Sequence, residues 1–200
     1  LGQTRSQGWK LRGVDEPLME LEKAGYNSLY AYRFDWDDQV SSYFADFPNL
    51  IGAAHGFEIS FITGDFKFGP IGRYVYPKGE LRNQMKETMM QAWASFAKTG
   101  IPTTGKNQEW KKFDSQDRVF MKLDSDEYLS LDKEILSLEF ITENVRLSPV
   151  GTLLEKCLLI QETFFNIGDY FKDEFMRWNQ GACKQFDMDF ERKKIETDLI

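Results

Sequence analysis

The chain has 200 residues, and its 25 Lys and Arg against 32 Asp and Glu give a formal net charge of −7. Hydrophobic residues make up 42% and aromatic residues 15%, a composition typical of a folded globular protein and not of a disordered segment. Charges of both signs are interspersed, without the clustered Lys and Arg of a nucleic-acid-binding protein. No apolar run approaches the roughly 20 residues of a membrane-spanning helix. We therefore expect neither nucleic acid nor a membrane as a partner.

The N-terminal part of the chain is predicted to contain a helix and a strand. Residues 1–13 are polar and contain glycine, and they are expected to form a loop or a ragged beginning of the chain. Asp15 suits the N-cap of a short helix, Pro17 its first turn, and Gly25 its end. Residues 28–36 alternate with period two, which predicts a strand. One face of that strand is entirely aromatic: Tyr30, Tyr32, Phe34 and Trp36.

A loop-rich segment and a long helix are expected next. Residues 46–79 are rich in Gly, Phe and Pro, and only a short element around 58–62 interrupts the predicted loop. Apolar residues then recur every three or four positions over 80–99, which predicts a helix. Gly100 ends this helix, and Pro102 prevents it from resuming.

The remainder is predicted as two short, peripheral strands at 119–123 and 128–131, followed by helices. Residues 148–149 (Ser-Pro) are expected to cap one helix, and a break at 168–169 separates it from the last one. The charged residues from Asp187 on are expected to fray. A single long strand with an aromatic face needs partners, so this pattern predicts the end of an α/β protein whose main sheet lies upstream.

Cys157 and Cys183 form no disulfide framework and have no metal-binding spacing. They either pair with each other or remain two buried thiols, and thiols are the default in a reducing compartment. The N-terminus shows no signal-peptide pattern. Because it starts at Leu1, we expect the chain to begin after the start of its gene, and the compartment, cytoplasmic or secreted, stays open.

His55 is the only histidine and lies among small residues in the sequence GAAHGFEI, residues 52–59. Gly56 permits a positive φ or a close backbone approach. An imidazole in a loop after a strand is suited to act as a general base. The alternative is a hydrogen-bonded histidine without a catalytic role, which is the more frequent situation for a lone histidine.

Other constellations favour no further site. The chain has no second histidine and no cysteine cluster, so no metal site and no cofactor are expected. Gly-x-Ser-x-Gly, the motif of a nucleophilic serine, is absent. The acidic residues after the first strand, Asp35, Asp37 and Asp38, could bind calcium but more often form a solvated strand end.

Three motifs occur in a fixed order: YRFDW at 32–36, GAAHGFEI at 52–59 and WASFAKTGIP at 93–102. Together they resemble the C-terminal part of the type B carboxylesterases, the cholinesterase-like branch of the α/β-hydrolases. The resemblance covers roughly residues 9 to 131 and includes features similar to those of bacterial members. The tail from 132 on resembles the family only loosely.

This resemblance implies an α/β fold, with residues 1–200 forming the C-terminal portion of an α/β-hydrolase domain and 132–200 a helical extension. It also implies a serine carboxylesterase with a Ser–Glu–His triad, in which His55 is the base. Phe57 is expected to line the substrate pocket, or only to pack in the core, and Gly56 and Glu58 to support the histidine loop.

In α/β-hydrolases the histidine is the last triad member along the chain. The nucleophile, the oxyanion loop and the triad acid would therefore precede Leu1. The expected partners are a small ester substrate and the N-terminal part of the same protein. The alternative function is a non-catalytic cholinesterase-like module for binding or adhesion.

Overall fold

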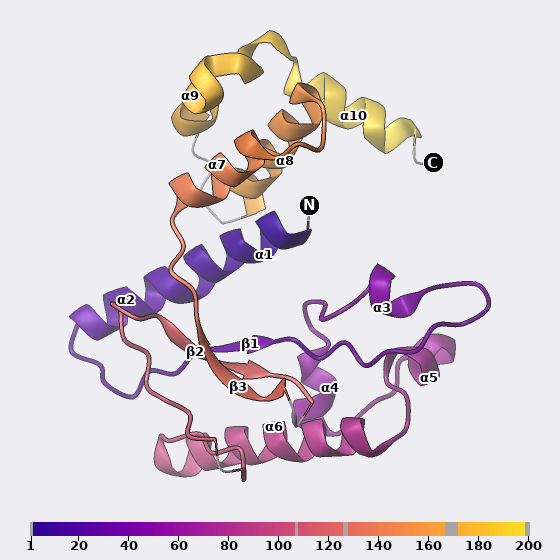
Figure 1. The fold of residues 1–200 in the computed structure, drawn as a ribbon, viewed down its shortest axis with the longest axis vertical. Coiled ribbons are helices and arrows are strands. Elements are labelled where there is room, and N and C mark those ends of the chain that lie inside the picture. Colours follow the sequence, from indigo (N-terminus) through magenta and orange to yellow (C-terminus); the bar gives the residue numbers. More distant parts are fainter. Residues whose placement is uncertain (1, 107, 126–127, 167–171, 199–200) are drawn as a thin grey trace. The chain divides into compact units, whose positions relative to one another are not determined.

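The computed structural model of the chain describes residues 2–106, 108–125, 128–166 and 172–198. They form two compact units, one made of residues 1–20 with 135–200 and the other of residues 21–134 (Figure 1). Among the described residues, helices outnumber strands, and the three strands belong to the unit of residues 21–134. Within the described ranges, no helix combines the length and apolar character needed to cross a membrane.

A three-stranded sheet in the order β1-β2-β3 lies in the unit of residues 21–134. β1 (Tyr32–Phe34) runs parallel to β2 (Val119–Leu123), and β2 pairs antiparallel with β3 (Ser130–Lys133). The strand predicted at 119–123 is confirmed, and β3 begins two residues later than predicted. The peripheral placement was wrong, since β2 is the central strand and its Met121 and Leu123 are fully buried.

The expected strand at 28–36 is hydrogen-bonded beyond the three residues of β1. The carbonyls of Leu29 and Ala31 accept from the amides of Phe113 and Met121 at 2.8 and 2.9 Å, and the amide of Asp35 donates to Leu123 at 2.8 Å. Backbone groups of alternate residues thus bond toward one side, as the predicted alternation requires.

The helices of this unit include the long one that the periodicity predicts. α6 spans Glu80–Thr99, and Gly100 follows it with a left-handed φ of 73°, as predicted. α4 (Glu58–Thr63) is the short element expected near residue 58. Three further short helical segments interrupt the predicted loop: α3 (Phe47–Leu50), the 3-10 helix η2 (Gly69–Ile71) and α5 (Gly72–Val75).

The aromatic face of the first strand packs on α4 and α6. The ring of Tyr32 lies 5.1 Å from that of Trp93 in α6, and Phe34 lies 5.7 Å from Phe61 in α4. Tyr30 contacts α6 in the same way, through an edge-to-face pair. Two helices of this same chain therefore cover the aromatic face of the strand.

The N-terminal segment is helical, so the loop predicted for residues 1–13 was wrong. α1 (Gly2–Lys10) continues through a π-helical turn, η1 (Leu11–Asp15), into α2 (Glu16–Lys23). Asp15 is not an N-cap, because it is a buried residue whose carboxylate pairs with Lys10 at 2.8 Å. α1 packs against α7 and α8. Tertiary contacts thus stabilise a helix whose own sequence is mostly polar. α2 ends before Gly25 as predicted.

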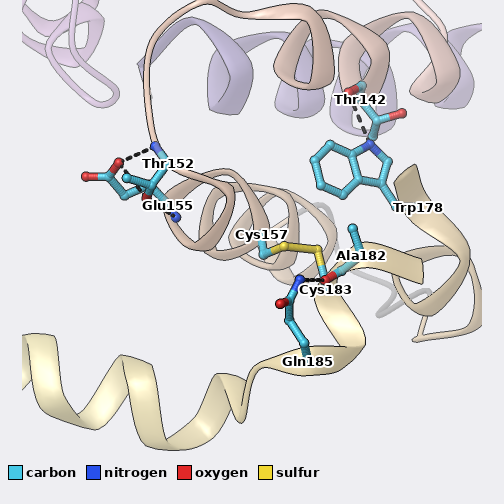
Figure 2. The surroundings of a disulfide bond; sticks show 8 residues. All are labelled: Thr142, Thr152, Glu155, Cys157, Trp178, Ala182, Cys183 and Gln185. Carbon is cyan, nitrogen blue, oxygen red and sulfur yellow. Dashed lines mark hydrogen bonds between the residues drawn. A yellow bond between two sulfur atoms is a disulfide. The ribbon is translucent and has the colours of Figure 1, made fainter. Parts of the chain in front are cut away.

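α7 (Leu138–Leu147) was missed, although Ser137 caps it by accepting from the amide of Phe140 at 3.0 Å. α8 (Leu153–Asn166) was predicted, but its cap is different. Thr152 and Glu155 form a reciprocal capping box, with amide-to-side-chain distances of 2.6 and 3.3 Å (Figure 2). Ser148 instead follows the end of α7.

Cys157 and Cys183 form a disulfide, so thiols as the default state were the wrong prediction (Figure 2). The bond joins α8 to the 3-10 helix η4 (Ala182–Gln185), which follows α9 (Lys172–Gly181). Both cysteines are buried in an apolar cluster with Ile160, Phe164 and Phe175. Nearby, Trp178 Nε1 donates to the carbonyl of Thr142 at 3.2 Å.

The end of the described chain is also helical. α10 spans Met188–Asp198, so the predicted fraying was wrong. Asp187 precedes this helix and accepts from the amide of Phe190 at 3.1 Å, which satisfies one of the free amides of the first turn. The break expected at 168–169 lies outside the described residues.

Candidate active site

The candidate site is the turn that carries His55, between β1 and α4. His55 is exposed. Two backbone hydrogen bonds shape the turn, from Ala54 to Gly52 at 2.9 Å and from Phe57 to Ala54 at 3.3 Å. Gly56 has a φ of 87°, which other residues adopt only with strain. Of the two possibilities that the sequence left open at Gly56, the structure has the positive φ.

A buried glutamine anchors this turn to the segment after β1. Gln39 is only 5% exposed, and its Nε2 donates to the carbonyl of Gly52 at 2.8 Å. The next residue, Val40, donates its amide to the carbonyl of Tyr74 at 2.9 Å. Nothing in the sequence pattern singled out Gln39, because a lone glutamine in a loop has no periodic or motif signal.

Phe57 is half-buried in an aromatic cluster at the start of α4. Its ring lies 5.3 Å from that of Phe68 and 5.8 Å from that of Tyr76. Its carbonyl accepts from the Tyr76 hydroxyl at 3.2 Å. The side chain therefore has packing partners.

Glu58 is in the first turn of α4, where a carboxylate suits the positive end of the helix dipole. Its charge reaches two phenols. Burial, and then the charge of Glu58, raise the pKa of Tyr32, and burial also raises the pKa of Tyr76.

Phe61 is the centre of the aromatic core beneath the turn. It is fully buried, and its ring lies 4.7 Å from Trp36, 5.2 Å from Phe66 and 5.8 Å from Tyr76. Trp36 lies two residues after β1, and Phe61 belongs to α4. This contact therefore holds the helix that follows His55 against the strand that precedes it.

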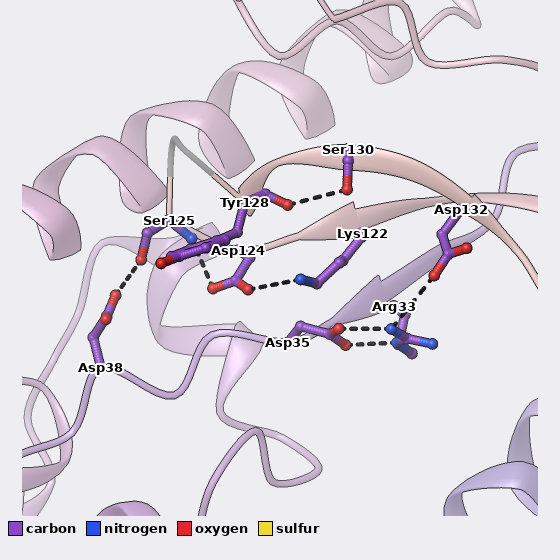
Figure 3. Close-up of polar contacts among 9 residues, drawn as sticks. All are labelled: Arg33, Asp35, Asp38, Lys122, Asp124, Ser125, Tyr128, Ser130 and Asp132. Atoms are coloured by element: carbon purple, nitrogen blue, oxygen red, sulfur yellow. Dashed lines mark hydrogen bonds and ion pairs between the residues drawn. The ribbon is translucent and has the colours of Figure 1, made fainter.

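The acidic residues after β1 form ion pairs and hydrogen bonds (Figure 3). Arg33 binds Asp35 through two hydrogen bonds of 2.7 Å, and Ser125 donates to Asp38. Burial and the neighbouring charges, Asp124 foremost, raise the pKa of Asp37. In the part of the chain that the structure describes, no three His, Cys, Asp or Glu side chains are grouped to hold a metal ion.

The described sheet combines one parallel and one antiparallel strand pair with helices, and the histidine turn follows α3. Residues 16–139, more than half of the chain, match the model of the Carboxylesterase family. The chain belongs to this family, and the resemblance to type B carboxylesterases is confirmed.

Curated relatives include bacterial and animal esterases. Para-nitrobenzyl esterase of Bacillus subtilis (strain 168) is 30% identical over 112 residues, which is 54% of this chain and 20% of that protein. Acetylcholinesterase 1 of Caenorhabditis elegans is 30% identical over 117 residues, 55% of this chain and 17% of that protein. Acetylcholinesterase of Danio rerio is 27% identical over 190 residues, 88% of this chain and 27% of that protein. The chain thus spans about a fifth to a quarter of the length of these relatives.

Proposed function

We propose that the chain is the C-terminal portion of an α/β-hydrolase domain in a serine carboxylesterase, and that His55 is its triad base. Residues 132–200 are the helical extension in this proposal. The observation that carries it is the family motif around His55, on an exposed turn that Gly56 and the Gln39 anchor hold between β1 and α4.

The edge of the sheet supports a continuation by a further strand. β1 is an edge strand, and Ala31 and Asp35 direct their backbone groups toward β2. The residues between and beside them, Tyr32 and Phe34, direct their backbone N–H and C=O groups to the side away from β2. No described strand pairs with that side, so a strand from an N-terminal part of the protein would extend the sheet there.

The proposed mechanism uses His55 as a proton carrier. Its imidazole takes the proton from the attacking serine hydroxyl and returns it to the leaving alcohol. The serine, the triad carboxylate and the oxyanion donors come from the N-terminal part in this proposal. Gly56 and Glu58 support the turn, and Phe57 borders the ester-binding pocket.

The test uses the full-length protein and a short p-nitrophenyl ester. His55→Ala is expected to lower kcat by about three orders of magnitude or more, because the serine loses its base. Glu58→Gln is the matched contrast in the same turn, with a modest loss of activity or stability. Thermal midpoints of both variants separate misfolding from loss of chemistry.

Added imidazole gives a second readout. Free imidazole is expected to restore part of the His55→Ala activity, since it can carry the same proton, whereas a purely structural histidine would not be replaced in this way. Retention of more than about a tenth of kcat would mean that less than roughly 1.4 kcal/mol of barrier was lost. His55 would then not be the base. If the unmodified full-length protein itself hydrolyses no ester, the result favours a non-catalytic binding module.

A further inference from the structure

A groove of about 570 Å³ lies in the unit of residues 21–134, formed by the segment from Phe66 to Arg82. This segment comprises η2, α5, the loop after them and the start of α6. No acidic residue is among the described residues that line the groove, and the sequence of residues 66–79 contains none. Four basic side chains line it, in a chain that is otherwise acidic: Lys67, Arg73, Lys78 and Arg82.

The positive charge of the groove is not neutralised by neighbouring carboxylates. In the described ranges, Arg73, Lys78 and Arg82 form no ion pair. Lys67 has one acidic neighbour, Asp65, but their charged atoms are 3.9 Å apart and the Lys67 side chain is 92% exposed. An exposed pair at this distance contributes little, so the groove keeps a net positive potential.

Aromatic rings hold the two arginines in place. The Arg82 guanidinium lies 4.6 Å from the centre of the Phe66 ring and donates through Nη1 to the carbonyl of Tyr76 at 3.1 Å. Arg73 lies 4.7 Å above the Tyr74 ring and donates through Nη2 to its hydroxyl at 2.8 Å. A guanidinium has five N–H donors, so these contacts position each arginine without using its capacity to bind an anion.

The same groove offers an apolar surface beside the charges. Three aromatic rings line it, those of Phe66, Phe68 and Tyr76. The centre of the Tyr76 ring lies 5.4 Å from that of Phe66 and 5.9 Å from that of Phe68. Phe68 is 39% exposed and also contacts Phe57. An occupant can therefore place an apolar body on these rings while its anionic group meets the basic side chains.

We propose that this groove binds a small organic anion, a carboxylate, sulfonate or phosphate carried on an aromatic or alkyl body. The rings supply contact area, and the arginines supply charge and hydrogen bonds in a fixed geometry. His55 does not line the groove, so the proposal does not depend on its role as the catalytic base.

The test is calorimetric titration of the full-length protein with 2-naphthoate, with the neutral 2-naphthamide as the matched probe. We expect 2-naphthoate to bind at least about tenfold more tightly, and its affinity to fall between roughly 0.02 and 0.5 M salt. Inorganic phosphate, which has charge without an apolar body, is expected to compete only weakly. Equal affinity of the two naphthyl probes would overturn the proposal.

Variants identify the groove as the site. Arg82→Gln and Lys78→Gln are each expected to weaken 2-naphthoate binding severalfold. Lys98→Gln removes one charge from the exposed end of α6, outside the groove, and is expected to leave binding unchanged. Lys78 has no packing role to lose, so its variant stays informative if Arg82→Gln folds poorly. If both groove variants bind like Lys98→Gln, the anion binds elsewhere and the assignment is wrong.

Discussion

The Cys157–Cys183 disulfide should contribute a large part of the free energy of unfolding of the unit that contains it. The two cysteines are 26 positions apart. For a closed loop of this length, the chain-entropy relation gives about 3.5 kcal/mol at 25 °C, by restricting the unfolded chain. Whole domains are stable by only about 5–15 kcal/mol. We therefore expect reduction to lower the free energy of unfolding of this unit by roughly a quarter to a half or more.

The measurement compares oxidised protein with protein that has been reduced in denaturant and refolded under a reductant. Reduction in denaturant is needed because both cysteines are buried. Hydrogen exchange of peptides from α8 along a urea series reports this unit alone. A loss of about 3.5 kcal/mol corresponds to a roughly 300-fold rise in the unfolded fraction.

The double variant Cys157→Ala/Cys183→Ala provides the control for the reductant itself. It should match the reduced protein apart from the small cost of removing two buried sulfurs. Ser137→Ala, which weakens only the cap of α7, calibrates the size of a one-contact effect. If oxidised and reduced proteins unfold at the same urea concentration, and mass spectrometry verifies the two redox states, the entropic reasoning is refuted.

Three further perturbations probe the core, a helix cap and a titrating group. Phe61→Ala should destabilise the unit of residues 21–134 by about 3–5 kcal/mol in a urea titration, because it leaves a cavity among four rings, whereas the 45%-exposed Phe96 should cost far less on the same change. Ser137→Ala should cost about 1 kcal/mol, visible as faster amide exchange in the first turn of α7. Because the folded state raises the pKa of Asp37, that state binds the proton more tightly, and stability should fall as pH rises through the folded pKa. Asp37→Asn should therefore raise the thermal midpoint at pH 7 and lose this advantage below about pH 3.8, the value for the unfolded chain.

The parts of the fold that local chemistry determines could be predicted from the sequence. Both ends of α6 were predicted correctly. Its apolar residues recur at the helical period, and Gly100 marks its end, so both signals are local in the sequence. β2 was predicted for the same reason, since four of its five residues are apolar and they lie close together in the sequence. The histidine turn was predicted from its glycine and small neighbours.

The parts that depend on distant contacts could not be predicted. α1 has a weak apolar pattern, and its contacts with α7 and α8 involve residues more than a hundred positions away. The disulfide depends on the chain returning to Cys157 after 26 residues, which no local pattern records. Gln39 belongs to the same class, because its role depends on Gly52, which lies 13 positions further on.

The two units are stabilised by different means, and this difference separates function from much of the stability. The apolar cluster around Trp36, Phe61 and Tyr76 draws its residues from 30–131 alone, whereas the cluster around the disulfide draws its residues from 138–188 alone. No described residue belongs to both clusters, so a cavity or a broken bond in one does not remove a described packing partner from the other. The proposed catalytic turn and the basic groove both rest on the first cluster, through Phe57, Phe66 and Tyr76. Reduction of the disulfide should therefore loosen α8 and η4 while leaving the turn of His55 and the groove with their contacts intact.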